Sequence, residues 1–166
     1  MVVNRIKSRR KGTHMEKSLE KIGVIEYIDI RVFAHATEDQ TKVEAATKNI
    51  FPSSLCEDIL FKKTSLTGHH SNPIVMVETR LKNRKLLLEA MQKFGAELSS
   101  LDKEQLSQDL PLHLDKGNLY LRFDKQAAYQ GTLKLTQNDP IHVKIHFKGQ
   151  SSQEIEDLAK QAGLLP

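Results

Sequence analysis

Several stretches of the chain alternate apolar and polar residues with a period of two, the pattern of a β-strand with one buried and one open face. In residues 22–34, Ile28 and Ile30 point to one side of the strand, whereas Asp29 and Arg31 point to the other. The same reasoning predicts strands over residues 22–34, 57–66, 73–80, 117–123, 133–135 and 141–147.

Between the strands, apolar residues spaced three and four positions apart predict helices. The first helix is predicted to open with a capping box of Thr37 and Gln40 and to end before Pro52. The next begins at about residue 81. Its predicted core stripe is Leu87, Met91, Phe94 and Leu98.

Three shorter helices are predicted in the second half of the chain. One begins near residue 102, where Leu101 and Leu106 are placed to form a hydrophobic staple. A brief helical turn is capped by Asp124, and the terminal helix opens with a capping box that starts at Ser151.

The order of these elements favours the α+β class: a two-layer sandwich of a largely antiparallel sheet with helices packed on one face. The 166 residues fit a single domain, residues 22–166, preceded by a basic and flexible arm, residues 1–21. The arm carries seven Lys and Arg against two Glu, and the remainder carries 18 basic and 19 acidic residues. Such an arm can contact phosphates without reading a base sequence; a solvated tail is the alternative.

The composition excludes several classes of protein. With 39% hydrophobic and 28% charged residues, the chain is a folded globular protein rather than a disordered one. The single cysteine, Cys56, excludes an internal disulfide and fits the reducing cytoplasm. Charges interrupt every long apolar stretch, so no membrane span is expected, and no apolar segment follows the basic N-terminus as in a secretory signal.

Common signatures of catalysis, metal binding and cofactor binding are missing, including GxxxxGK[ST], GxGxxG, HExxH and CxxC. His142 and His146 share a strand face, but four residues of strand span about 13 Å, too far for one metal ion. The adjacent His69 and His70 would need a third ligand such as His35. We therefore predict no catalytic residue, metal or cofactor. A ribonuclease that uses His35 with His69 or His70 stays open as an alternative.

Two features of the sequence favour nucleic acid as a ligand. Basic residues are in excess over residues 60–93, inside the folded region. Outward strand positions also combine aromatic and basic side chains that can stack on bases and hold phosphates. These positions are Tyr27, Arg31, Tyr120, Arg122, His142, Lys144 and His146. The alternative is that they form the polar face of a half-solvated sheet, or that helices cover them.

A turn-rich segment, residues 67–73, is predicted to join two strands as a hairpin. Its backbone N–H groups, together with His69, His70 and Asn72, can contact a phosphate or a base edge. A rigid turn without a ligand is the alternative.

Four segments taken together resemble a known family. They are His35-Ala-Thr-Glu-Asp39, Gly68-His-His-Ser-Asn-Pro-Ile74, Leu119-Tyr-Leu-Arg-Phe-Asp-Lys-Gln-Ala-Ala128 and Asp139-Pro-Ile141. In this order, over about residues 22–150, they resemble the archaeal RNA-binding proteins described as predicted exosome subunits. In that family a glycine often stands where this chain has Ser71. The resemblance implies RNA binding, a link to the exosome or to ribosome-associated RNA, and no catalytic residues. It also implies a fold like that of the large-subunit ribosomal protein that binds 5S RNA.

We therefore predict a non-catalytic, cytoplasmic RNA-binding protein that positions structured or single-stranded RNA for a larger machine, such as the exosome or the ribosome. The predicted RNA contacts are Lys62, Lys63, His69, His70, Asn72, Arg80, Lys82, Arg84, Lys85, Arg122 and Lys125. For Arg122, an internal ion pair with Asp29 or Asp124 is an alternative.

A second hypothesis is a protein–protein adaptor or a homodimer with no direct RNA contact. It would use the open sheet face through apolar packing around Tyr27, Phe33 and Tyr120.

Overall fold

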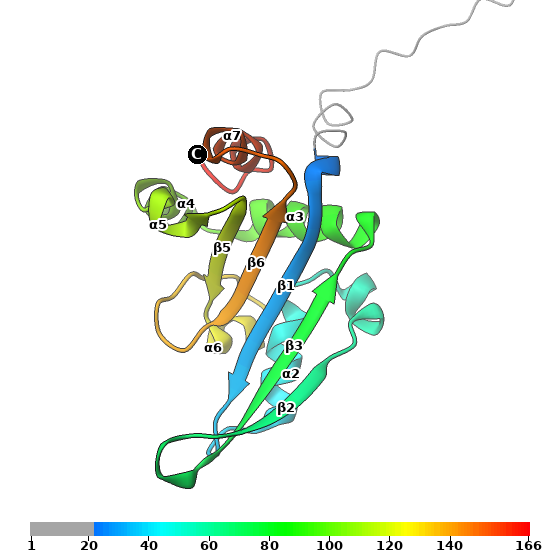
Figure 1. Ribbon diagram of the computed structural model, residues 1–166, viewed down its shortest axis with the longest axis vertical. Helices are drawn as coiled ribbons and strands as arrows, with labels where there is room; N and C mark the ends of the chain where they lie inside the picture. The colour runs from blue at the N-terminus through cyan, green and yellow to red at the C-terminus, as the bar shows by residue number, and fades with distance from the viewer. Residues whose placement is uncertain (1–21) are drawn as a thin grey trace, which may run out of the picture.

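The computed structural model describes residues 22–166, and the predicted basic arm lies outside them. The elements form one sheet and a layer of helices (Figure 1). In chain order they are η1 (Ile22–Val24), β1 (Ile25–Ala34), α2 (Gln40–Asn49), η2 (Ser53–Asp58), β2 (Lys62–Thr67), η3 (His69–Ser71), β3 (Pro73–Leu81), α3 (Arg84–Glu97), α4 (Ser100–Gln108), α5 (Leu110–His113), β4 (Leu114–Asp115), β5 (Asn118–Phe123), α6 (Lys125–Tyr129), β6 (Ile141–Phe147) and α7 (Ser152–Gln161).

The six strands form a single sheet in the order β2-β3-β1-β6-β5-β4, and every neighbouring pair is antiparallel. Helices α2, α3 and α6 lie behind the sheet in the view of Figure 1, and within residues 22–166 no helix crosses its front. The predicted α+β sandwich is confirmed. None of the helices in these residues is both long and apolar enough to traverse a bilayer.

The core lies between the sheet and the helices, on the side of the sheet to which the alternating apolar residues of the strands point. Ile28, Val32, Leu121, Phe123 and Val143 project from three strands and are at most 1% exposed. The predicted stripe of α3 packs against them, since its four residues are all buried. Because each large side chain buried in this way contributes roughly 1.5–3 kcal/mol, the inward face holds the two layers together.

The start of α2 differs from the prediction. The helix begins at Gln40, and its N-cap is Asp39, whose carboxylate accepts hydrogen bonds from the backbone N–H groups of Thr41 and Lys42. The predicted capping box of Thr37 and Gln40 is wrong. The residues before Asp39 form a turn instead, closed by a bond from the Glu38 N–H to the carbonyl of His35.

Three other predictions need correction. The strand predicted over 57–66 begins only at Lys62; residues 57 and 58 belong to the 3₁₀ helix η2, which buries Leu55. The predicted strand 133–135 is reduced to one bridge between Leu135 and Phe123. The staple before α4 is not formed, because Leu101 is 75% exposed, and the helix is capped by Ser99.

Helix α7 packs closely against α3 at one point. A Cβ added at Gly95 in α3 would collide with the backbone carbonyl of Ala162, which caps the C-terminal end of α7. Only a residue without a side chain lets these backbones approach so closely.

We expect Gly95→Ala to destabilise the fold by about 2 kcal/mol, although alanine is otherwise the better helix former, because the added methyl group must push α7 away. Urea denaturation measures the change in unfolding free energy. Gln92→Ala, at an exposed position of the same helix, is the matched control and should change stability by less than about 0.5 kcal/mol. Equal stability of Gly95→Ala and the wild type would contradict the close contact.

Candidate nucleic-acid interface

Side chains on the open face of the sheet form rows across the strands, because directly paired residues of antiparallel strands point to the same side. One row crosses five strands and consists of Lys62 on β2, Glu78 on β3, Arg31 on β1, His142 on β6 and Arg122 on β5. We call it the charged row. Three of its members are cations, one is a histidine, and Glu78 alone is acidic.

The adjacent row is largely neutralised. Arg80 donates two hydrogen bonds to the carboxylate of Asp29, and Lys144 lies 4.0 Å from the same carboxylate. The hydrogen bond to Asp29 raises the pKa of Arg80. This row ends at Tyr120, which is directly paired with Lys144.

Tyr27 is covered by its neighbours on the two flanking strands. The Arg80 guanidinium lies 4.1 Å from the Tyr27 ring centroid, and the His146 ring stacks on it at 4.8 Å. His146 is held in turn by Asn118, 2.8 Å from its Nδ1 atom, and by Glu26. The Tyr27 ring is therefore already in contact with Arg80 and His146.

A groove of about 710 Å³ runs over the open face. Its walls include the charged row, its neutralised neighbour, and the aromatic rings of Phe33 and Tyr120, but not Tyr27 or His146. Five cations line it against two carboxylates: Arg31, Lys62, Arg80, Arg122 and Lys144 against Asp29 and Glu78. Each carboxylate forms an ion pair with one of these cations, and the cations that remain give the groove a net positive charge.

Arg122 does not form either of the ion pairs considered from the sequence. Its Nη1 donates to the side-chain oxygen of Gln137 at 2.7 Å. Asp29 is bound to Arg80, and Asp124 caps α6 by accepting a hydrogen bond from the N–H of Ala127. The guanidinium of Arg122 therefore keeps its charge uncompensated by these two carboxylates.

The pKa of His142 reports the field in the groove. Partial burial lowers this pKa below its ordinary value, and the nearby charges of Arg122 and Arg31 lower it further. Asp139 acts in the opposite direction but does not outweigh them. The imidazole is therefore in an electropositive environment.

The remaining predicted RNA contacts are spread over the molecule. Lys82, Arg84 and Lys85 are exposed where β3 leads into α3, whereas His69, His70 and Asn72 are exposed at the opposite tip of β3, in the β2–β3 hairpin (Figure 1). Because β3 spans Pro73–Leu81, the two groups are separated by about 26 Å of strand. They do not share one surface patch, and only Lys62, Arg80 and Arg122 of the predicted set line the groove.

Two predicted contacts face away from the groove. Lys63 pairs with Val77 on the helix side of the sheet and forms an ion pair with Glu44 of α2, at 2.8 Å. The side chain of Lys125 is only 12% exposed and lies between Glu38 and Asp139. We therefore remove both lysines from the candidate interface.

The hairpin tip is a tight turn. The Gly68 N–H donates to the carbonyl of Asn72 at 2.8 Å, and His70 and Ser71 both have positive φ, at 58° and 61°. Left-handed backbone favours glycine, which explains why a glycine suits the position of Ser71. Both loop histidines are exposed at this tip.

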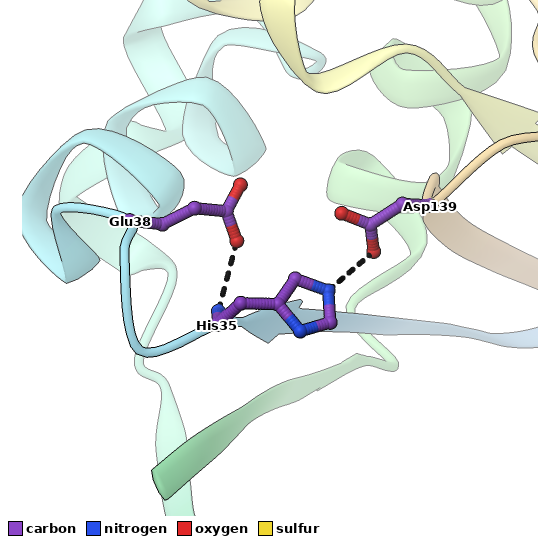
Figure 2. A group of neighbouring side chains, drawn as sticks. All are labelled: His35, Glu38 and Asp139. Carbon is purple, nitrogen blue, oxygen red and sulfur yellow. Dashed lines mark hydrogen bonds and ion pairs between the residues drawn. The ribbon is translucent and has the colours of Figure 1, made fainter. Parts of the chain in front are cut away.

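Lys125 belongs to a cluster that the sequence analysis did not foresee. His35, Glu38 and Asp139 point toward one another from the end of β1, the turn before α2 and the loop before β6 (Figure 2). The Lys125 ammonium donates to Asp139 at 2.8 Å, to Glu38 at 3.2 Å and to the carbonyl of Phe33 at 2.6 Å. The Nε2 atom of His35 lies 3.0 Å from Asp139.

The ligand atoms of His35, Glu38 and Asp139 lie close enough to hold a metal ion. The ammonium of Lys125, however, already supplies the positive charge between the two carboxylates. A divalent cation would have to displace it at the cost of like-charge repulsion. The arrangement is therefore that of an internal ion-pair cluster.

Comparison with known proteins identifies the family. Residues 27–147 match the model of a family described as RNA binding. The chain belongs to this RNA-binding family. Its relatives include the RNA-binding protein PAB1135 of Pyrococcus abyssi, which is 36% identical over 124 residues, 73% of this chain and 80% of that protein.

Solved structures show the same fold. Protein AF2318 from Archaeglobus fulgidus superposes with a TM-score of 0.71 at 25% identity, covering 83% of this chain and 99% of the other. Mth689 from Methanothermobacter thermautotrophicus gives a TM-score of 0.66 at 29% identity, covering 86% and 98%.

Three of the four segments through which the chain resembles the archaeal family meet at the ion-pair cluster. His35 and Glu38 come from the first segment, Lys125 from the third and Asp139 from the fourth. Their presence in the segments that carry the resemblance was the signal that the sequence offered for this cluster. In this RNA-binding family member it connects β1, α2, α6 and the entry to β6.

We expect Lys125→Met to destabilise the fold by about 2 kcal/mol at pH 7, because Glu38 and Asp139 are left close together without a cation. Partial burial alone would raise the pKa of Asp139, but hydrogen bonds from Lys125 and His35 outweigh it and hold the pKa below its ordinary value. The stabilisation is therefore present above about pH 4 and is lost as the pH falls through the lowered pKa.

Urea denaturation at pH 7 and pH 3 measures the effect, and the difference between variant and wild type should shrink at the lower pH. Lys134→Met, at an exposed position, is the control. A pH-independent difference would show that the methionine acts through packing and not through charge.

Proposed function

We propose that this chain is a non-catalytic RNA-binding protein and that the groove on the open face of the sheet is its RNA contact surface. The observation that carries the proposal is the excess of cations along this groove, where five basic side chains face two carboxylates that are already paired. Membership of the RNA-binding family supports it, as does the similarity to the RNA-binding protein PAB1135.

The groove offers different contacts to the two parts of a nucleotide. Lys62, Arg31 and Arg122 supply charge for phosphates, with Arg31 57% exposed. Phe33 and Tyr120 supply rings on which unpaired bases can stack. We therefore favour single-stranded RNA, or a single-stranded loop of a folded RNA, over a continuous duplex.

The adaptor hypothesis is less well supported by this geometry. It requires an apolar centre around Tyr27, Phe33 and Tyr120, but Arg80 and His146 cover Tyr27, and charged side chains separate the other two rings. Charged residues are depleted at the centres of protein–protein interfaces. The charge of the groove thus favours RNA as the ligand.

Two outlying sets extend the proposed interface. Lys82, Arg84 and Lys85 at one end of β3, and His69, His70 and Asn72 at the other, would contact only an RNA long enough to leave the groove. They should add affinity for long RNA and little for a short oligonucleotide.

The wider setting of the protein is proposed from the resemblance alone. It supports a cytoplasmic protein that presents RNA to a larger machine, with the exosome or the ribosome as the two candidates. It also supports a likeness of fold to the ribosomal protein that binds 5S RNA. Purification of the native protein with its bound RNA and proteins, with and without nuclease treatment, would test these partners.

We expect the double variant Lys62→Gln/Arg122→Gln to bind a short single-stranded RNA at least tenfold more weakly than the wild type, because two phosphate contacts of the groove lose their charge. Fluorescence anisotropy of a labelled RNA octamer is measured between about 50 and 200 mM salt, the range in which counterion release is visible. It gives the affinity and the slope of the logarithm of affinity against the logarithm of salt concentration. The slope should fall by about 0.7 for each lost phosphate contact.

The matched control is Lys42→Gln/Lys160→Gln, which removes two lysines from helices α2 and α7 and leaves the groove intact. It should bind RNA like the wild type. Wild-type binding that is equal at low and high salt, or an equal loss in the control, would argue against the groove as the RNA site.

A further inference from the structure

The charged row places one titratable group between two cations. Arg31 and Arg122 are both directly paired with His142, one on each side. The Cβ atoms of such pairs are about 4.5–5.5 Å apart, and like charges at this distance destabilise a sheet. The row therefore disfavours the imidazolium form of His142 in the free protein, unless an anion joins it.

Within residues 22–166, most of the charges that act on His142 are positive. On its own strand the neighbour on the same face is Lys144, and α6 contributes Lys125. The nearby carboxylate, Asp139, is engaged by Lys125 and His35. Beyond Arg31 in the row, Glu78 is bound to the Nε atom of that arginine at 2.9 Å.

His142 also differs from the other histidine of the open face. The ring nitrogens of His146 are engaged by Asn118 and Glu26, whereas the His142 ring forms no hydrogen bond or ion pair within residues 22–166. His142 lines the groove and His146 does not. The imidazole of His142 is therefore the group that is able to respond to a ligand in the groove.

We propose that Arg31, His142 and Arg122 form a phosphate subsite, in which His142 takes up a proton from solvent when an RNA phosphate enters. The subsite deepens the proposed function and rests on it, since the phosphate belongs to RNA bound in the groove. The subsite consists of three residues from three strands, and its change of protonation state does not follow from membership of the family.

The physical reason is the reversal of the field at the imidazole. In the free protein, burial and the two arginines lower the pKa of His142 from its ordinary value and so favour the neutral ring. A phosphate that accepts hydrogen bonds from Arg31 and Arg122 cancels their effect and adds a negative charge beside the ring. Both changes favour the imidazolium, which then donates to the phosphate.

The sign of the pH dependence follows from proton linkage. Because the complex holds one more proton than the free protein, affinity increases as the pH falls through the interval between the lower free pKa and the higher bound pKa. The slope cannot exceed tenfold per pH unit for one proton. Above that interval the affinity does not change with pH.

The test measures binding of a labelled uridine octamer by fluorescence anisotropy at constant ionic strength from about pH 7.5 to 5.5, the range in which histidine titrates. Phosphodiesters and uracil do not titrate there. We expect the affinity of the wild type to rise about three- to tenfold on acidification. His142→Gln should lose this rise, so that its affinity at the lower pH equals its own affinity at the upper pH.

The matched control is His146→Gln, which removes the other histidine of the face and should keep the pH dependence. A direct readout is the NMR titration of the His142 ring in the free protein and with the octamer, where its pKa should increase on binding. In a third experiment sulfate replaces RNA, and the pKa of the His142 ring is compared in sulfate and in chloride at equal ionic strength.

The outcomes separate the two proposals. Tight, salt-sensitive RNA binding with no pH dependence, or with a dependence that survives in His142→Gln, overturns the subsite and leaves the proposed function standing. Absence of RNA binding at every pH, with the His142 pKa raised by sulfate, overturns the function but retains an anion subsite. If the protein binds no RNA and sulfate does not raise the pKa of His142, both the proposed function and the subsite are overturned.

Discussion

Burial of one face of the sheet is the constraint on which the rest of the structure depends. Because successive side chains of a strand point to opposite sides, a slip of one residue in β1 or β6 would turn Ile30 or Val143 toward water. The helices behind the sheet therefore fix the register of the strands, and the register fixes which side chains meet on the other face. The charged row is a consequence of packing in the core.

The uncovered face shows two ways of arranging charges on one surface. In one row Asp29 lies between Arg80 and Lys144 and neutralises most of their charge, which stiffens the sheet and covers Tyr27. In the charged row the single carboxylate binds Arg31, and Arg122 has no carboxylate beside it in the row. The two arginines lower the pKa of His142, which lies between them, and so disfavour a third positive charge there.

The sequence predicted well to which side of the sheet each strand residue points. It predicted poorly which residues of other strands lie next to it. Alternation alone identified Arg31, Arg122 and His142 as outward residues, because this pattern is local. It could not show that Arg80 binds Asp29, which lies 51 positions away, because strand order depends on the whole fold. Proximity in sequence also misled: the hairpin and the 82–85 segment flank the same strand and therefore lie at its opposite ends.

Lys125 shows how a residue singled out for one role can mark an important place for another reason. The sequence predicts it as an RNA contact, and in the structure its ammonium binds Glu38, Asp139 and a carbonyl of β1. Asp139 has a positive φ of 41° and lies three residues before His142, at the point where the chain enters β6. By holding Asp139, Lys125 fixes the start of the strand that carries the imidazole between the two arginines. The lysine thus acts on the charged row through the backbone, as a positioning residue.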